Sequence, residues 1–371
     1  MKRILIDANP SANFLATGHI SGISRTNMEL IQALSLVRDS LDFEITLYSQ
    51  NLKGVSAKRL NSGFKTIHSY LRNNSSWNEL AKIMRVRELL GRYDLQHITH
   101  NFENITDPSK CIVTIHDVMF LSYPEAQVCP ECNRRLIPPF ARSACHIITI
   151  SENSKREIMK YMNVSEERIS VIHWGIDHKS LYPHCVPTNR FCDNKPYFIS
   201  VSCDTGRKNT ISVLRAYQKF ALDFPKHHLI LVWRRPSEEA IQLIKEYGLE
   251  KRVHFASNIS NEELADLYAG ATASFFPSLY EGFGLPIAES MACGVPCVTC
   301  RNSSLEEVGG EAAIYVDPLD TDAMAEIMAN FENHNFDMDV LRQASIIQAS
   351  KFTWEECAKK TIEVYHKCLG L

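Results

Sequence analysis

The chain has 371 residues, of which 45% are hydrophobic and 22% charged, with a formal net charge of −3. At ~100–200 residues per domain, this length predicts two domains. No apolar run approaches the ~18 residues that a membrane-spanning helix needs. The N-terminal sequence M-K-R-I-L-I-D-A-N has one short apolar run before Asp7, which is typical of a buried first strand rather than a signal peptide. We therefore expect a cytoplasmic protein whose twelve cysteines are free thiols.

Short β-rich runs alternate with helical patterns along the chain. The first series of predicted strands covers residues 3–7, 44–49, 94–99, 111–116, 146–150 and 169–173. The second series covers residues 197–202, 228–233, 252–255, 273–276 and 296–299. Helical patterns lie between the strands, for example at 23–37, 209–223, 237–247 and 261–269. Strands that alternate with helices indicate parallel sheets covered on both faces, so the sequence predicts an α/β protein with two doubly wound domains.

A predicted linker separates the two series. Residues 180–196 contain three prolines, two cysteines and little periodicity. We place the N-terminal domain at residues 1–182 and the C-terminal domain at 190–350. Near the end of the chain, Thr353 as N-cap and Glu356 three residues later predict a capping box and a helix that runs to about Cys368. Ligands of such proteins bind at the carboxyl ends of the strands, so we expect a site in a cleft between the domains.

The most informative segment is residues 280–289, which read Y-E-G-F-G-L-P-I-A-E. A hydrophobic strand precedes it, and a helix is expected to start near Pro286, because proline suits the first helical position. Gly282 and Gly284 allow the backbone to approach a ligand closely. The free amides at a helix start favour an anion or a ring of hydroxyls. Glu281 and Glu289 flank this turn, and each carboxylate can accept paired hydrogen bonds from vicinal hydroxyls of a sugar or a ribose.

The string resembles the E-x7-E motif of retaining family-4 glycosyltransferases, which have the GT-B fold. The resemblance extends over nearly the whole chain. It includes C-D-T-G-R-K-N at 203–209, V-P-C-V at 295–298, S-L-E-E-V-G-G at 304–310, S-G-I-S-R at 21–25, H-I-T-H-N at 97–101 and T-I-H-D at 114–117. The similarity is greatest to the subgroup containing mannosyltransferases of bacterial surface-polysaccharide assembly. It implies two Rossmann-like domains that face a cleft, with the C-terminal helix (353–371) crossing back to the N-terminal domain.

The resemblance also implies roles for individual residues. Glu281 would hold hydroxyls of the donor sugar, and Glu289 would bind the ribose. Arg207 and Lys208 would neutralise the donor diphosphate, and His116 would lie by the anomeric centre. The main-chain amides expected to help at the donor sugar and phosphates are those of Gly22, Gly282, Phe283, Gly284 and Leu285. Further loop or acceptor contacts are expected from His100, Asn101 and Asp117.

The chain departs from the family after the predicted strand at 229–232. Its relatives usually have glycine-rich sequence there, whereas this chain has Trp233-Arg234-Arg235-Pro236. Arg234 could supply an extra positive charge to the phosphates. The base of the nucleotide therefore stays open: GDP-mannose is the first choice, with UDP-glucose, UDP-N-acetylglucosamine and GDP-fucose as alternatives.

Neither a metal nor another cofactor is expected. Glycosyltransferases of the other common fold hold a metal with D-x-D, and the D-x-D of this chain, at 337–339, reads as a carboxylate pair at a helix start. A glycogen-type phosphorylase would need a longer chain and a lysine Schiff base. A nicotinamide dehydrogenase would need G-x-G-x-x-G after the first strand. A non-catalytic nucleotide-sugar binder remains an alternative.

The acceptor is expected to be a glycan or a lipid-linked saccharide, not a nucleic acid. Residues 51–92 carry nine basic residues and two acidic ones, Glu79 and Glu88. The basic residues are Lys53, Lys58, Arg59, Lys65, Arg72, Lys82, Arg85, Arg87 and Arg92. Such a stretch is either a solvated helical face or a patch for anionic lipid or a lipid-diphosphate acceptor, which would place the protein at the inner face of the membrane.

Overall fold

A computed structural model provides the fold. It describes residues 1–18, 22–70, 92–100, 107–123, 130–185, 191–202, 206–233 and 235–371, with the backbone alone for 130–132. The chain divides into two compact units, one formed by Met1–Gly175 with Trp354–Leu371 and the other by Ile176–Thr353. Residues 180–185 and 191–196, from the segment suggested as a linker, belong to the second unit.

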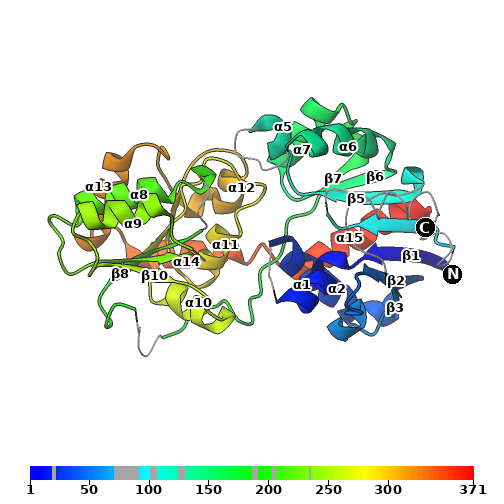
Figure 1. The fold of residues 1–371 in the computed structure, drawn as a ribbon, viewed down its shortest axis with the longest axis horizontal. Helices are drawn as coiled ribbons and strands as arrows, with labels where there is room; N and C mark the ends of the chain where they lie inside the picture. Colours follow the sequence, from blue (N-terminus) through cyan, green and yellow to red (C-terminus); the bar gives the residue numbers. More distant parts are fainter. Residues whose placement is uncertain are drawn as a thin grey trace. The chain divides into compact units, whose positions relative to one another are not determined.

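Unit 1 contains a seven-stranded sheet in the order β3-β2-β1-β4-β5-β6-β7, with all its strand pairs parallel (Figure 1). The strands are β1 (Lys2–Asp7), β2 (Phe43–Gln50), β3 (Lys65–Ser69), β4 (Leu95–Ile98), β5 (Cys111–Ile115), β6 (His146–Thr149) and β7 (Ile169–Val171). The helices are α1 (Asn9–Thr17), α2 (Gly22–Leu36), α5 (Met119–Ser122), α6 (Pro130–Ser143), α7 (Glu152–Met162) and α15 (Trp354–Leu369).

Two hydrophobic cores enclose this sheet. On one face, Ile4 and Ile6 of β1 pack with Leu34 of α2 and with Tyr365 of α15. On the other face, side chains of β5 and β6 pack against α6 and α7. Strands buried on both faces read as nearly continuous apolar runs, and this is why β1, β5 and β6 are recognisable in the sequence. Helix α15, the last of the chain, is therefore part of the first unit, as the fold expectation required.

Unit 2 contains a six-stranded parallel sheet in the order β10-β9-β8-β11-β12-β13. Its strands are β8 (Tyr197–Val201), β9 (His228–Val232), β10 (Val253–Ala256), β11 (Ala273–Phe275), β12 (Cys297–Thr299) and β13 (Ile314–Tyr315). Its helices are α8 (Thr210–Phe220), α9 (Glu238–Glu246), α10 (Asn261–Ala269), α11 (Leu285–Ala292), α12 (Leu305–Gly309), α13 (Thr321–Glu332) and α14 (Met338–Ala349).

Helices cover both faces of the second sheet as well. Figure 1 shows α8, α9 and α13 on one side of the strands and α10, α11 and α14 on the other. The strand order reverses between β8 and β11, where the chain leaves one half of the sheet and starts the other. Such a reversal opens a crevice at the carboxyl ends of the strands, which is the usual ligand position in doubly wound sheets. The loops after β8 and β11 therefore mark the place for a site in this unit.

Candidate active site

The turn that follows β11 has the backbone geometry of a ligand-binding helix start. Helix α11 begins at Leu285, with proline in its first turn and Gly284 as the preceding N-cap residue. Gly284 has φ +116°, and a Cβ atom there would lie 3.1 Å from Leu305 Cδ2 and 3.3 Å from Ile287 Cδ1. Only glycine adopts such a backbone without strain. The sequence prediction of a helix near Pro286 is confirmed.

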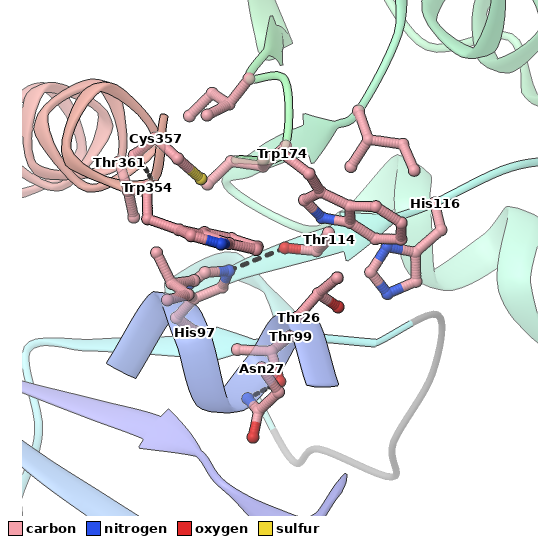
Figure 2. A pocket seen from close by; sticks show the side chains of 14 residues that line it. Thr26, Asn27, His97, Thr99, Thr114, His116, Trp174, Trp354, Cys357 and Thr361 are labelled. Carbon is pink, nitrogen blue, oxygen red and sulfur yellow. Dashed lines mark hydrogen bonds between the residues drawn. The ribbon is translucent and has the colours of Figure 1, made fainter. Parts of the chain in front are cut away.

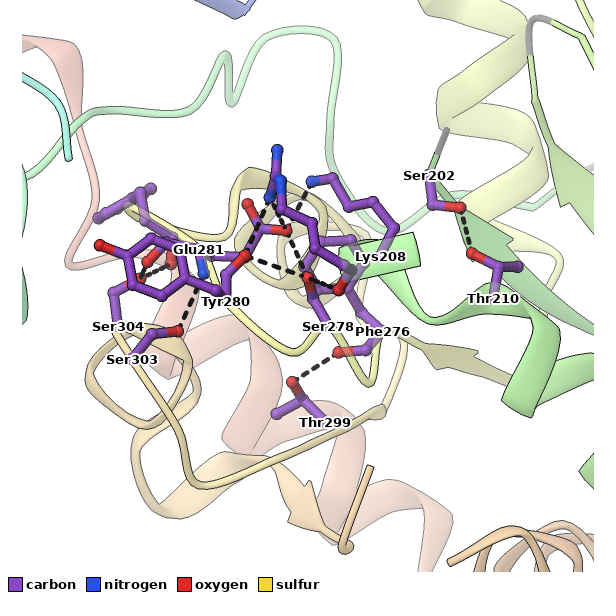
Figure 3. A network of polar contacts seen from close by, with 12 residues as sticks. Ser202, Lys208, Thr210, Phe276, Ser278, Tyr280, Glu281, Thr299, Ser303 and Ser304 are labelled. Carbon is purple, nitrogen blue, oxygen red and sulfur yellow. Dashed lines mark hydrogen bonds and ion pairs between the residues drawn. The ribbon is translucent and has the colours of Figure 1, made fainter. Parts of the chain in front are cut away.

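Glu281 is the centre of a polar network in this turn (Figure 3). Its Oε1 lies 2.6 Å from Nζ of Lys208, 2.9 Å from Nη1 of Arg207 and 2.7 Å from Oγ of Ser278. The residue is only 7% exposed. Two cations around one carboxylate leave a net positive charge at the turn, which suits an anionic ligand.

The charge state of Glu281 follows from these neighbours. Burial of the carboxyl group favours its neutral form, but the charges of Lys208 and Arg207 and the hydrogen bonds from Lys208 and Ser278 outweigh burial. The pKa of Glu281 is therefore lowered from its ordinary value. Since an ionised carboxylate only accepts hydrogen bonds, Glu281 presents acceptors to any hydroxylated ligand.

The two basic residues are fixed to the turn by its backbone. They belong to the short 3-10 helix η6 (Gly206–Lys208) that precedes α8. The amide of Leu279 donates to Arg207 O at 2.7 Å, and Arg207 Nη1 also donates to Tyr280 O at 2.9 Å. The side-chain Nδ2 of Asn209 donates to Pro277 O at 3.0 Å. The loops after β8 and β11 are thus joined to each other. They bring Arg207, Lys208 and Glu281 together, as the sequence suggested.

A third loop, after β12, supports the turn, a role that was not predicted although Ser304 begins the S-L-E-E-V-G-G segment noted in the sequence. Ser303 has φ +44°, and its Oγ accepts from the Glu281 amide at 3.0 Å. Ser304 Oγ lies 2.9 Å from Glu281 O and 2.8 Å from Phe283 O. Thr299 Oγ1 donates to Phe276 O at 2.8 Å. These bonds join segments about twenty residues apart through main-chain atoms, so no sequence pattern reports them.

Glu289 lies on α11, inside the unit. Its side chain is 3% exposed, and Oε2 lies 3.4 Å from the hydroxyl of Tyr268 on α10. Phe283, another residue expected at the donor, buries its ring against Phe352 with ring centroids 5.5 Å apart. Only main-chain atoms of Phe283 are therefore suited to a ligand. Of the D-x-D pair, Asp337 is the N-cap of α14 and accepts from Val340 N at 3.1 Å, so the expected helix-start carboxylate is confirmed.

In unit 1, a small cavity of about 20 Å³ is lined by polar side chains of α2, β4 and β5 and by apolar ones that include Trp174 and Trp354 (Figure 2). This volume is about that of one water molecule. His97 is at its base, with Nδ1 2.7 Å from the hydroxyl of Tyr365 and Nε2 2.9 Å from Oγ1 of Thr114. These contacts connect α15, β4 and β5. Burial, slightly opposed by the charge of Asp7, lowers the pKa of His97 to about 3.

His116 follows β5 and lines the same cavity. Its side chain is 6% exposed, and its ring centroid lies 5.1 Å from that of Trp174. Burial, together with the nearby charge of His100, lowers the pKa of His116 to about 3. His116 is therefore neutral near pH 7, with one ring nitrogen as a donor and the other as an acceptor.

The other predicted residues of unit 1 occupy separate positions. Asp117 Oδ1 accepts from Met119 N at 3.0 Å, so this carboxylate holds the start of α5. Gly22 is the first residue of α2, and a Cβ atom there would meet no atom within 4 Å. His100 follows β4. Asn101, Arg234 and residues 71–91 of the basic stretch lie outside the described residues.

Two family models match the chain and together cover most of it. Residues 20–180 match glycosyltransferase family 4, and residues 187–351 match glycosyl transferases group 1. The chain belongs to the family-4 glycosyltransferases. The resemblance noted in the sequence is thereby confirmed, and the protein is a glycosyltransferase with two Rossmann-like units, the GT-B fold.

Several of the proteins similar to this chain are named mannosyltransferases. The chain is 27% identical to the O-antigen chain mannosyltransferase B of Escherichia coli over 93% of this chain and 96% of that protein. It is 31% identical to the MMP alpha-(1->4)-mannosyltransferase of Mycolicibacterium hassiacum over 62% of this chain and 56% of that protein.

Solved structures share the fold. Sucrose-phosphate synthase of Thermosynechococcus elongatus superposes with a TM-score of 0.76 at 17% identity over 100% of both chains. HepE of Anabaena, solved with UDP and glucose, superposes with a TM-score of 0.73 at 20% identity over 99% of this chain and 100% of that one. Within the described residues of this glycosyltransferase, no helix is long and apolar enough to cross a membrane.

Proposed function

We propose that this glycosyltransferase moves a hexose from a nucleotide-diphosphate sugar to a glycan or lipid-linked saccharide acceptor, in the synthesis of surface polysaccharide or another glycoconjugate. The observation that supports this best is the cluster of Lys208, Arg207 and Glu281. It combines cations for a diphosphate with a carboxylate for hydroxyls at one helix start. A nucleotide sugar offers both kinds of group side by side.

The donor residues have distinct parts in this proposal. Lys208 and Arg207 neutralise the diphosphate, while Glu281 and the amides of Gly282 to Leu285 hold the sugar hydroxyls. Glu289 binds the ribose, which requires its carboxylate to exchange the long contact with Tyr268 for ribose hydroxyls. In unit 1, Gly22 provides backbone amides to phosphate, and His116 acts at the anomeric centre.

The proposed reaction retains the configuration at C1. The bond between C1 and the diphosphate oxygen breaks, and the acceptor oxygen forms the new bond to C1 on the same face. The acceptor proton passes to the departing phosphate oxygen, so no side-chain nucleophile is needed. The cations stabilise the leaving dianion as its charge develops. Trapping a covalent glycosyl-enzyme would contradict this route.

The reaction is proposed to be independent of metal ions. Lys208 and Arg207 provide at the turn the positive charge that a divalent cation provides in other glycosyltransferases. Transfer should therefore continue in EDTA at the rate found without it. A loss of activity in EDTA that Mg²⁺ or Mn²⁺ restores would overturn this part of the proposal.

The sugar is proposed to be mannose, carried by GDP. The support is that both relatives described above are named mannosyltransferases. A UDP-sugar, with glucose or N-acetylglucosamine, is the second candidate, because the structural neighbour HepE was solved with UDP and glucose. A panel of nucleotide sugars separates the two, since the matching donor gives the largest rise in melting temperature.

The binding experiment tests the core of the proposal. A ligand at ~100 times its dissociation constant stabilises the folded state by ~2.7 kcal/mol. We expect GDP, or UDP for the second candidate, to raise the melting temperature accordingly. No shift with any nucleoside diphosphate would refute donor binding. Slow hydrolysis of the donor without acceptor would distinguish an enzyme from a protein that only binds nucleotide sugars.

The acceptor is proposed to lie at an anionic membrane surface. Five of the nine basic residues between 51 and 92 are described, namely Lys53, Lys58, Arg59, Lys65 and Arg92, and the first four lie in or before β3. Attraction between such residues and anionic lipid is screened by salt. We therefore expect the protein to bind anionic vesicles at low salt and to be released at high salt. Binding that salt does not affect would contradict this location.

A further inference from the structure

Ser278 lies at the centre of the donor turn, and its side chain is fully buried. Its Oγ lies 2.7 Å from Oε1 of Glu281, 2.9 Å from Arg207 O and 3.3 Å from Tyr280 O (Figure 3). A hydroxyl has a single proton to donate. The shortest of the three contacts is the one to a charged acceptor, where hydrogen bonds are strongest. Ser278 therefore donates to the carboxylate of Glu281.

The two oxygens of Glu281 are used unequally. Oε1 receives three donors, from Ser278, Arg207 and Lys208. Oε2 receives a hydrogen bond or ion pair from none of the described residues, and Glu281 as a whole is 7% exposed. Because a carboxylate is planar, fixing one oxygen and the Cα side of the residue also fixes the direction of the other oxygen. Oε1 thus holds the carboxylate in place, and Oε2 is left to accept a hydrogen bond from a ligand.

The three side chains that donate to Oε1 of Glu281 differ in what else they contact. Arg207 Nη1 also bonds Tyr280 O, so this side chain is held to the backbone of the turn. Lys208 uses one of its three N–H groups on Glu281 and lies 4.9 Å from the centroid of the Phe276 ring. Its other N–H groups can bind phosphate oxygens. Ser278 has one hydroxyl proton and is fully buried, so it can donate to the carboxylate of Glu281 but to no ligand at the same time.

We propose that Ser278 is a positioning residue for recognition of the donor sugar, which with Arg207 fixes Oε1 of Glu281 so that Oε2 faces a hydroxyl of the sugar. This inference rests on the function proposed above. It separates two kinds of ligand. A nucleoside diphosphate needs the cations alone, whereas a nucleotide sugar needs both the cations and the Glu281 carboxylate that accepts hydrogen bonds from its hydroxyls. Loss of the Ser278 hydroxyl should therefore weaken binding of a nucleotide sugar and leave binding of a nucleoside diphosphate unchanged.

Isothermal titration of the full chain with GDP-mannose and GDP, and with UDP-glucose and UDP as a second pair, tests this separation. For the pair that the wild type binds, Ser278→Ala should lower the affinity for the nucleotide sugar about tenfold, since a hydrogen bond to a charged group is worth ~1.5 kcal/mol or more. Affinity for the nucleoside diphosphate should stay within about twofold of the wild type. An equal loss for both ligands, or no loss for either, would overturn the role of Ser278.

Two further variants keep the result interpretable. Thr299→Val is the matched control, because Thr299 is also fully buried but donates to the backbone of the turn, at Phe276 O. It should show no loss confined to the nucleotide sugar, and such a loss would overturn the proposal. Ser278→Cys retains the size and a weak donor, so it should restore part of the affinity that Ser278→Ala loses. No restoration would count against a hydrogen-bonding role.

A double-mutant cycle then identifies the partner. In a Glu281→Ala background, Ser278→Ala should cause no further loss of nucleotide-sugar affinity, because the group it positions is gone. Additive losses would overturn the proposal. If the wild type binds none of the four ligands, the proposed function fails together with this inference. If it binds them and only the Ser278 results differ from expectation, the inference alone fails.

Discussion

Lys208 and Glu281 form an ion pair at 2.6 Å in which neither side chain is more than 14% exposed. Buried pairs of this kind are costly to form, and they are retained where the charges serve another purpose. In this protein, the pair keeps an ammonium and a carboxylate together beside a helix start. If this turn binds the donor as proposed, binding should need little rearrangement of it.

Removing either partner of this pair should abolish transfer. Lys208→Ala and Glu281→Ala should each lower kcat by ~100-fold or more. Lys208→Ala removes a charge that stabilises the leaving diphosphate in the transition state, and Glu281→Ala removes the acceptor for the sugar hydroxyls. The fold should persist, since Arg207 and Ser278 still hold Glu281 in the first variant. Steady-state kinetics with a melting curve measure both effects.

Lys219→Ala is the matched control for this prediction. Lys219 lies on α8 of the same unit and pairs with Asp322 at 2.7 Å near the surface. This variant should keep wild-type turnover. Retained turnover in Lys208→Ala or Glu281→Ala would contradict the assigned roles.

Gly284→Ala should destabilise the second unit. Alanine at φ +116° is strained, and its Cβ would press on Leu305 and Ile287. We expect a loss of ~1–2 kcal/mol in the free energy of unfolding, measured in urea. Gly206→Ala is the control, because no atom lies within 4 Å of the position of its Cβ. Equal stability of the two variants would show that the turn relaxes freely.

Gly22→Ala separates a ligand effect from a folding effect. A Cβ at Gly22, the first residue of α2, meets no protein atom within 4 Å, so stability should change by less than ~1 kcal/mol. If a donor phosphate approaches this backbone, the methyl group should nevertheless weaken nucleotide binding. Titration with GDP or UDP measures this. Unchanged affinity would remove Gly22 from the donor site.

The buried histidine His97 should make the first unit sensitive to acid. Its pKa is lowered to about 3, chiefly by burial, whereas the unfolded chain titrates near 6.5. Between these values the unfolded state binds more protons, so the free energy of unfolding falls as the pH drops below 6.5. The slope from one such group is at most ~1.4 kcal/mol per pH unit.

His97→Gln should therefore show a shallower fall in melting temperature between pH 7 and pH 4.5 than the wild type. The variant also loses contacts to Tyr365 and Thr114, so it should melt lower than the wild type at pH 7. The comparison concerns the slopes alone. Parallel curves for the two proteins would mean that His97 is not the group responsible.

The sequence predicts most of this fold because its strands are buried on both faces. The apolar runs that became β1, β5, β8 and β9 stand out for that reason. Strand β3, K-T-I-H-S, was not predicted, because it forms an edge of the sheet and its side chains are mostly half-buried or exposed. Strand β13 has only two residues, which is too short for an alternating pattern.

The turn proposed to bind the donor was only partly predictable. Arg207, Lys208 and Glu281 were recognisable because they are adjacent to glycines and helix starts in a motif. Ser278 and Ser303 were not, since their importance lies in contacts made across the fold. The burial of Glu289 against Tyr268 was also invisible, because helical position alone does not say which side of α11 faces the interior.

The position of α15 has a consequence for how the protein is made. The chain leaves unit 1 at Gly175 and returns to it at Trp354, beside the bridge between Ile176 and Thr353. Tyr365, on this returning helix, is fully buried against β4. On the ribosome, the first half of the chain therefore emerges early but lacks part of its own interior until residues 354–371 have been synthesised. The second unit, which is complete in one continuous stretch, is free to finish folding before the unit that precedes it.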